Sequence, residues 1–275
     1  MFRGEFMTLQ CIKIAAQQAN PVLVGIFVIL MGLVSQGCER KRSGESFLLE
    51  CKIGADQGRT ISGSWEVRPI PIAFRVTNSS SSNFTPSEMT EVLNAARTWN
   101  QFFEVSMGFP IFDIGPSGNP YTTTEPLVPD VCNGATMISG NNFVREMIIE
   151  KRTSGWTTAQ EDVLAITDFC SPGGIMRFAQ LRFNYQFFHN AGQRDPDLES
   201  LALHELGHVM GLNHSCQAGQ AGEGFPSCGA FPSSHEYIQA VLFPGLNFIN
   251  GVGQIRRALQ DNDMGRANCA YKAES

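Results

Sequence analysis

The chain of 275 residues is predicted to form a domain of the α+β class. Residues 85–103 and 196–210 each combine a helix start signal with apolar residues at near-helical spacing. Apolar segments such as 163–167 lie between these two predicted helices and are candidate strands. Residues 67–275 contain no internal repeat and no long hydrophobic run, so a single domain is expected there.

The first predicted helix follows a polar turn at residues 78–83. Thr85-Pro86-Ser87-Glu88 is a capping-box pattern, with threonine as the N-cap, proline at the first helical position and glutamate at the third. The helix is therefore expected to start at this proline.

The segment after this helix, residues 105–140, is rich in glycine, proline and threonine and has no clear period. Such a composition is typical of a surface loop, here around one short strand. Asp113 and Asp130 lie in this loop and are candidate Ca²⁺ ligands. The alternative is that both are ordinary solvated acids.

The second predicted helix carries the most informative motif of the chain. The motif is His204-Glu205-Leu206-Gly207-His208-Val209-Met210-Gly211-Leu212-Asn213-His214. Residues four apart lie on the same face of a helix, so His204 and His208 can present ring nitrogens to one ion. Asp195 and Pro196 fit an N-cap followed by proline at the first helical position, which predicts a helix over residues 196–210.

The motif predicts a catalytic Zn²⁺ site rather than a structural one. Gly211 can end the helix in a left-handed conformation without steric cost, and the chain then returns to place His214 as the third ligand. Three protein ligands leave the fourth position open for water. Glu205 lies beside the metal without binding it and is the expected general base, acting on a water whose pKa zinc lowers to about 7.

The alternative interpretation of residues 204–208 alone is a surface helix with two unrelated histidines. The longer motif fixes five residues, and a chance match has a frequency on the order of 10⁻⁸ to 10⁻⁷ per start position. The metal-site interpretation is therefore favoured.

This motif resembles the zinc signature of the metzincin metalloproteases. Ser215, directly after the third histidine, is similar to the matrixin branch, which contains the matrix metalloproteases and their bacterial relatives. The likeness covers roughly residues 67–275 and is strong in the motif and weak elsewhere. The segments that resemble further elements of the family are residues 71–76, 85–103, 143–150, 175–184 and 259–271.

The resemblance implies a zincin-like catalytic domain. Such a domain has a twisted, mixed, five-stranded sheet with one antiparallel edge strand, about three helices and a zinc cleft below the edge strand. The edge strand is expected at residues 163–167, with Ala165 contacting the substrate. Because an exposed edge offers unpaired backbone groups, an extended peptide can add to it as a further strand. A plain buried strand is the alternative.

Metzincins place a methionine in a tight turn beneath the zinc, and this chain departs from that pattern. The best candidate turn, residues 240–244, has Leu242 at that place. The methionine of the family is an apolar floor rather than a ligand, and exchange with leucine conserves volume at a cost usually below ~1.5 kcal/mol. The prediction of an active enzyme is therefore kept.

By the same resemblance, Pro244 and Leu246 form the wall of the pocket that accepts the side chain after the scissile bond. An ordinary proline turn is the alternative interpretation. The loop 215–235 is expected to flank the same side of the cleft. The second, structural zinc of animal matrixins is not expected, because only His189 and His235 remain outside the motif.

The N-terminal region predicts export. Residues 21–34 form an apolar run of the length of a signal-peptide core, which gives a signal peptide over residues 1–37. Residues 35–38 resemble a bacterial lipobox, although an apolar residue is expected where Ser35 stands, and they predict a lipid anchor at Cys38. The protein is then a cell-surface or outer-membrane lipoprotein; full secretion is the alternative. Residues 38–66 are polar and charged and are predicted to be a tether.

Six cysteines remain in the exported chain besides Cys38, and they can form up to three disulfides. Fifteen pairings are open, and only the short loop between Cys216 and Cys228 favours one pair. The other expected pairs, by elimination, are Cys132 with Cys170 and Cys51 with Cys269. An alternative for Cys51 is a thiolate that blocks the zinc in a latent form, like the matrixin cysteine switch, although residues 50–54 fit that motif poorly.

Charge excludes one class of partner. Loss of residues 1–37 removes Arg3, Lys13 and Glu5 from the 20 basic and 26 acidic residues, which leaves 18 and 25 and a net charge of −7. Binding to nucleic acid is therefore not expected. We expect a monomer whose partner is an extended peptide or protein substrate.

The sequence as a whole predicts a zinc-dependent endopeptidase that hydrolyses extracellular proteins or peptides. One alternative is a surface lipoprotein on an inactive metzincin scaffold that binds polypeptide without cleaving it. Leu242 motivates this alternative, and Glu205 argues against it, because a pure binder has no need of that carboxylate. A third hypothesis, an exported structural protein with a chance motif, predicts no bound metal.

Overall fold

The computed structural model describes residues 49–66, 71–77, 83–123, 145–190 and 194–272, which belong to one compact unit, Phe47–Ser275. The predicted signal peptide, the lipid-anchor motif at Cys38, most of the turn at 78–83, Asp130 and Cys132 lie outside the described residues. Within the described part of the chain, no helix has the length and apolar character that crossing a membrane requires.

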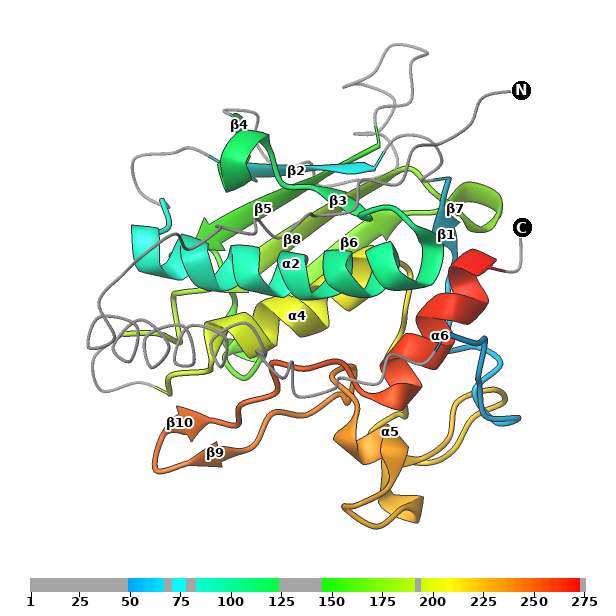
Figure 1. The fold of residues 1–275 in the computed structure, drawn as a ribbon. Coiled ribbons are helices and arrows are strands. Elements are labelled where there is room, and N and C mark those ends of the chain that lie inside the picture. The colour runs from blue at the N-terminus through cyan, green and yellow to red at the C-terminus, as the bar shows by residue number, and fades with distance from the viewer. Residues whose placement is uncertain (1–48, 67–70, 78–82, 124–144, 191–193, 273–275) are drawn as a thin grey trace, which may run out of the picture. The chain divides into compact units, whose positions relative to one another are not determined.

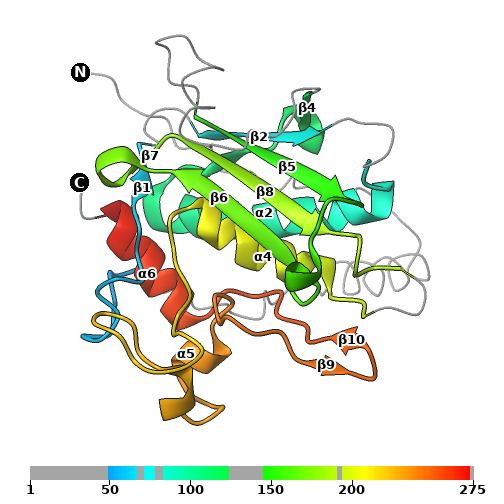
Figure 2. The ribbon, with the colours of Figure 1, turned by 180° about the vertical axis from the view of Figure 1, so that it is seen from behind.

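A mixed sheet of six strands forms one layer of this unit (Figure 1). The strands are β2 (Ile72–Thr77), β3 (Phe112–Asp113), β4 (Tyr121–Thr123), β5 (Glu146–Arg152), β6 (Ala165–Cys170) and β8 (Phe178–Asn184). Their order is β3-β2-β5-β8-β6, and β4 pairs with a later part of the β2 edge that β3 occupies. Every pair is parallel except β6 with β8, so β6 is an antiparallel edge strand (Figure 2).

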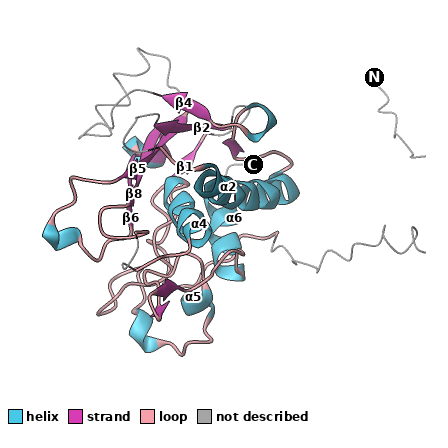
Figure 3. Cartoon of the chain, turned by 90° about the vertical axis from the view of Figure 1, so that its left-hand side faces the viewer, coloured by secondary structure: helices cyan, strands magenta, loops and turns pink. Residues whose placement is uncertain are grey.

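Two long helices cover one face of the sheet. They are α2 (Pro86–Met107) and α4 (Leu198–Val209), and Figure 3 shows both on the same side of the sheet, which is seen from its edge. The helices pack on each other through Trp99 of α2, whose indole donates a hydrogen bond of 3.0 Å to the carbonyl of Leu203 in α4. Trp99 is fully buried with Phe102, Phe103 and the inward side chains of the strands, so the core lies between helices and sheet.

The capping box of α2 is confirmed. The hydroxyl of Thr85 accepts from the backbone of Glu88 at 3.3 Å, and the carboxylate of Glu88 accepts from the backbone of Thr85 at 2.6 Å. The helix runs four residues past the predicted end at 103, because the first left-handed stop is Gly108, with a φ of 82°.

The predicted N-cap of the zinc-motif helix is wrong by two residues. The N-cap is Asp197, whose carboxylate accepts from the backbone of Ser200 at 2.9 Å. Asp195 cannot start the helix because its backbone is already paired: its N–H donates to Gly251 and its carbonyl accepts from Gly253, at 2.8 and 2.9 Å. This pairing ties the start of α4 to the hairpin of β9 (Phe248–Ile249) and β10 (Val252–Gly253).

The predicted strand at 175–184 is interrupted. Ile175–Met176 forms β7, which pairs with β1 (Ser64–Trp65) outside the main sheet, and β8 starts only at Phe178. The main sheet has six strands instead of the predicted five. The additional strand is β4, which pairs with β2 and comes from a segment whose sequence has no clear period. The described residues hold four α-helices, with α5 (Glu236–Gln239) and α6 (Asp261–Lys272) after α4.

Residues 49–66 pack on the domain, although their polar composition predicted a tether. β1 pairs with β7, and the backbone of Ser62 donates to the carbonyl of Gly211 at 2.7 Å. The disulfide Cys51–Cys269 joins the same segment to α6. Contacts with residues far along the chain, which composition does not reveal, decide the place of this segment.

Two predicted disulfides are confirmed, Cys51–Cys269 and Cys216–Cys228. Cys170 is disulfide-bonded as well, and its predicted partner lies outside the described residues. Because Cys51 is bonded to Cys269, the alternative in which its thiolate blocks a zinc ion is wrong for this structure.

Candidate metal centre

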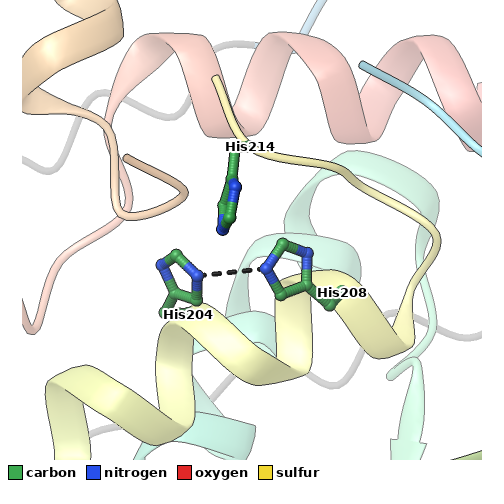
Figure 4. A group of neighbouring side chains, drawn as sticks. All are labelled: His204, His208 and His214. Carbon is green, nitrogen blue, oxygen red and sulfur yellow. Dashed lines mark hydrogen bonds between the residues drawn. The ribbon is translucent and has the colours of Figure 1, made fainter. Parts of the chain in front are cut away.

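The three histidines of the motif converge on one point. His204 and His208 project from successive turns of α4, and His214 faces them from the segment after the helix (Figure 4). The Nε2 atoms of His204 and His208 lie 3.0 Å apart, and one ligand atom from each of the three rings lies within 4.8 Å of the others. Among the described residues, this is the one group of three side chains of ligand type with such a geometry.

Gly211 makes the return of the chain sterically feasible. Its φ is 88°, and a Cβ atom at this position would lie 2.2 Å from the carbonyl oxygen of Gly63. Its N–H donates to the carbonyl of His208, and the next N–H, of Leu212, donates to Gly207. The glycine therefore closes the helix with satisfied carbonyls and directs His214 back toward α4.

Backbone carbonyls fix the orientation of the first two rings. Nδ1 of His204 lies 2.8 Å from the carbonyl oxygen of Val241, and Nδ1 of His208 lies 2.7 Å from that of Leu212. A carbonyl oxygen only accepts, so in each ring Nδ1 carries the proton and the lone pair of Nε2 faces the other ring. Carbonyl partners of this kind are common behind metal-ligating histidines.

Burial keeps the rings neutral. It lowers the pKa of His208 to about 3, with repulsion from a protonated His214 adding to the effect and the hydrogen bond to the carbonyl of Leu212 opposing it. Burial, together with Arg266, lowers the pKa of His214 to about 4. The pKa of His204 is also held well below its usual value, first by burial. Neutral imidazoles are the form that binds a metal, so the donor set is ready near pH 7.

These residues fit a zinc ion. Zn–N distances of about 2.0–2.1 Å place the nitrogens of a tetrahedral site roughly 3.3 Å apart, close to the 3.0 Å between the two Nε2 atoms. Two lone pairs that face each other at this distance without a proton between them repel, and a shared cation removes that repulsion. Three imidazoles without a fourth protein ligand match a site that admits water or substrate.

Glu205 follows the first histidine in α4, lines the same cavity as His204 and His214, and is only 5% exposed. Burial raises its pKa to about 7, while the hydrogen bond from the Thr167 hydroxyl, 2.6 Å from Oε2, opposes the shift. A carboxylate that titrates near neutral pH can both take up and release a proton. Thr167 comes from β6, so the edge strand orients the candidate base.

Leu242 forms an apolar floor under α4. It is fully buried, and its methyl carbon Cδ2 would lie 2.6 Å from a Cβ built on Gly207, in the helix turn between the first two histidines. The backbone N–H groups of Val241 and Leu242 donate to the carboxylate of Asp263, at 2.8 and 3.1 Å. The tight turn thus has leucine in the place expected from the sequence. Asp263 of α6 holds the backbone of this turn.

Asp263 belongs to a buried network that the sequence did not reveal. Its carboxylate lies 3.5 Å from the guanidinium of Arg266, and both side chains are inaccessible to solvent. Arg266 also donates to the carbonyl of Asn213 at 2.7 Å, next to the third histidine. Acidic and basic residues on one short helix indicate a polar face, and nothing in the sequence identifies their distant partners.

A cavity of about 500 Å³ opens beside the histidines and Glu205. The three residues predicted to contact substrate, Ala165, Pro244 and Leu246, all line it. Ser200 and Arg256 line it too, and sequence analysis assigned them no role.

The calcium prediction stays open. Asp113 accepts hydrogen bonds of 3.0 Å from the backbone of Gly115 and from the hydroxyl of Tyr121. Within the described residues, Asp113 belongs to no group of three side chains of ligand type. Asp130, the other candidate ligand, lies outside them.

Comparison with protein-family models finds no match for the chain, and a search of curated proteins finds no significant one. The site itself combines three convergent imidazoles, a buried carboxylate whose pKa burial raises to about 7, and an adjoining cavity.

Proposed function

We propose that the protein is a zinc-dependent endopeptidase with a metzincin-like, zincin-type catalytic domain. One observation carries the proposal: the Nε2 atoms of His204 and His208 face each other 3.0 Å apart, while both Nδ1 atoms lie within hydrogen-bond distance of backbone carbonyls. His214 supplies the third imidazole, and Glu205 lines the same cavity as His204 and His214. Three imidazoles are a ligand set that suits Zn²⁺.

A zinc ion held by His204, His208 and His214 would polarise the scissile carbonyl and lower the pKa of the attacking water. Glu205 takes a proton from that water as its oxygen bonds to the carbonyl carbon. When the carbon–nitrogen bond breaks, Glu205 returns the proton to the departing amine, so the base is regenerated. Burial raises the pKa of Glu205, and Thr167 holds its Oε2 in place through a hydrogen bond of 2.6 Å.

The proposed substrate is an extended segment of an extracellular protein or peptide. Strand β6 pairs with β8 along one edge, and no described strand pairs with its other edge. Free backbone groups on an edge strand bind extended peptides with little dependence on sequence. We assign Ala165 at the start of β6 to this contact, and Pro244 and Leu246 to the side chain after the scissile bond; all three line the cavity.

The proposed location is outside the cytoplasm, with a lipid anchor at Cys38 or, as the alternative, free secretion. Disulfides form and persist in oxidising compartments, and Cys51–Cys269 and Cys216–Cys228 are both present. The lipid anchor is checked by mass spectrometry of the N-terminal peptide. An acylated cysteine supports it, and an unmodified N-terminus near residue 38 indicates secretion.

The experiment that tests the function combines metal content with turnover. We expect about one zinc ion per chain and cleavage of casein or gelatin that stops with a chelator. Glu205→Gln should keep the zinc and the fold but lose about 10²- to 10⁴-fold in turnover. Glu104→Gln, an exposed change on α2, is the matched control and should cleave like the parent. Zinc binding without cleavage would instead support the polypeptide-binding alternative. Absence of metal would contradict both the peptidase and the metzincin-like binding protein.

A further inference from the structure

The cavity beside the histidines combines apolar walls with one basic group. Apolar side chains from β6, α4 and the turn after α5 line much of it, among them Leu201, Val241 and Phe243. Arg256 lines the same space from the segment between β10 and α6. A guanidinium in a largely apolar pocket needs an explanation, because burial of a cation is costly unless it is paired.

Neutral partners fix the position of Arg256. Its Nη1 donates to the carbonyls of Ile238 and Ala240, at 2.9 and 2.6 Å, and its Nη2 lies 3.4 Å from the amide oxygen of Gln254. The guanidinium also lies over the ring of Phe243, 5.1 Å from its centroid. These contacts fix the position of the group without a carboxylate partner.

No carboxylate forms an ion pair with Arg256 within the described part of the chain. Its Nε is buried and has no acceptor there. The two neighbouring arginines differ: Arg194, on the same cavity, pairs with Asp162, and Arg257 pairs with Asp197 and Glu199. Burial lowers the pKa of Arg256 from its usual value, while the charge of Asp263 opposes the shift.

We propose that Arg256 is a specificity-determining residue that binds a substrate carboxylate in this cavity, so that the protein prefers Glu or Asp directly after the scissile bond. This inference rests on the proposed peptidase function. The Nε–H of Arg256 has no acceptor within the described residues, and a guanidinium binds a carboxylate through charge-assisted hydrogen bonds, which an amide or an alkyl side chain cannot replace. The cavity adjoins His204 and Glu205, so a side chain bound there belongs to a residue next to the cleaved bond.

The serine at position 200 supports the same arrangement. Its hydroxyl accepts from the backbone N–H of Arg256 at 2.7 Å and donates to the carboxylate of Asp197 at 2.5 Å. The start of α4 therefore fixes the backbone of Arg256, and neutral carbonyls fix its side chain. A preorganised cation of this kind distinguishes ligands by charge without first having to be ordered.

The test compares peptides that differ only in the residue after the cut, Glu, Gln or Leu, all with an amidated C-terminus. For the parent we expect kcat/KM to be at least about tenfold higher for Glu than for Gln or Leu. In Arg256→Gln the ratio of Glu to Gln should fall to about one, and Arg256→Lys should keep part of it. Arg97→Gln, on the exposed face of α2, is the matched control and should keep the parent ratio.

The ratio of kcat/KM for the Glu peptide to that for the Gln peptide distinguishes substrate recognition by Arg256 from a purely structural role. If Arg256 served only to hold the carbonyls of Ile238 and Ala240, its loss would lower kcat/KM for all peptides by the same factor. An unchanged ratio in Arg256→Gln, or a parent that cleaves the Leu or Gln peptide best, overturns the proposal. The carboxylate that Arg256 binds could belong to an acidic side chain or to the C-terminus of the substrate. A further peptide with Leu after the cut and a free terminal carboxylate distinguishes these two sources. Preference for that peptide over its amidated form assigns Arg256 to the chain terminus instead.

A binding measurement keeps this inference distinct from the peptidase proposal. Labelled Glu and Gln peptides are titrated into zinc-loaded parent and Arg256→Gln protein, and fluorescence anisotropy gives their Kd values. Tighter binding of the Glu peptide that depends on Arg256, without cleavage, refutes the proposed function and upholds the carboxylate site. Cleavage without any preference for the Glu peptide upholds the proposed peptidase function and refutes the carboxylate site.

Discussion

Leu242 lies directly against Gly207, so closely that a Cβ atom on this glycine would come within 2.6 Å of Cδ2 and 3.0 Å of Cδ1 of the leucine. Because the helix has no side chain there, the tight turn approaches α4. The carbonyl of Val241, one residue before the leucine, can then bind Nδ1 of His204 at 2.8 Å. The glycine in the zinc motif thus has a packing role in addition to its place between two ligands.

Gly207→Ala is expected to destabilise the protein although alanine is the better helix former. The gain in helix propensity is about 1 kcal/mol, and overpacking a buried site costs about 1–3 kcal/mol. Urea unfolding should show a net loss of stability, and a zinc titration should show weaker binding. Gly229→Ala, where a new Cβ has no neighbour closer than 3.8 Å, is the control without overpacking. A Gly207→Ala protein more stable than the parent would show that the side chain of Leu242 can move aside without cost.

Asp263→Asn should disturb the site from a distance. The carboxylate accepts from the backbone of Val241 and Leu242 and is buried with Arg266. Loss of its charge leaves an unpaired buried guanidinium, for which about 3–5 kcal/mol of destabilisation is typical. Calorimetry measures the loss, and a zinc titration should show weaker binding because the carbonyl that orients His204 moves.

Asp261→Asn is the matched control for this change, since Asp261 is exposed at the start of the same helix. Equal effects of the two substitutions would contradict the role assigned to the buried carboxylate.

Acid should weaken the start of α4 through Asp197. Burial raises its pKa, but hydrogen bonds from Arg257 and Ser200 more than offset this, so the pKa is lower than in the unfolded chain. A lowered folded pKa means that the carboxylate stabilises the fold above its unfolded pKa of about 3.9. This contribution is lost as the pH falls through the folded pKa.

In Asp197→Asn, the free energy of unfolding should therefore fall less steeply below about pH 4 than in the parent. Asparagine is also a good N-cap, so the helix itself should persist. Denaturant titrations at several pH values measure the difference. Parallel pH profiles of the two proteins would exclude Asp197 as a source of the acid sensitivity.

Removal of metal should lower thermal stability reversibly. A ligand that binds only the folded state at 100 times its Kd stabilises it by about 2.7 kcal/mol. A chelator should therefore lower the Tm, and added zinc should restore it. His214→Ala removes the third ligand and should abolish most of this response, whereas His235→Ala, outside the metal group, should keep it. A Tm that ignores both chelator and zinc would contradict a zinc site in the folded protein.

Local patterns in the sequence predicted much of the fold and most of the site. The capping box at Thr85, the helix that carries the histidines, the left-handed glycine after it and the pair Cys216–Cys228 all depend on residues that lie no more than 12 positions apart. Such signals survive without knowledge of the rest of the chain, because helix periodicity and capping act over one or two turns. The convergence of the three histidines follows from the same short segment.

The sequence by itself thus determined which residues can hold a metal and which carboxylate lies beside them. Tertiary structure decided what surrounds them. Asp263 holds the turn of Leu242, Thr167 reaches Glu205, and Arg256 enters the cavity, each across at least 16 residues of chain. These contacts depend on how separate elements pack. The burial and geometry of the packed elements determine which distant groups meet, and no local pattern of residues encodes them.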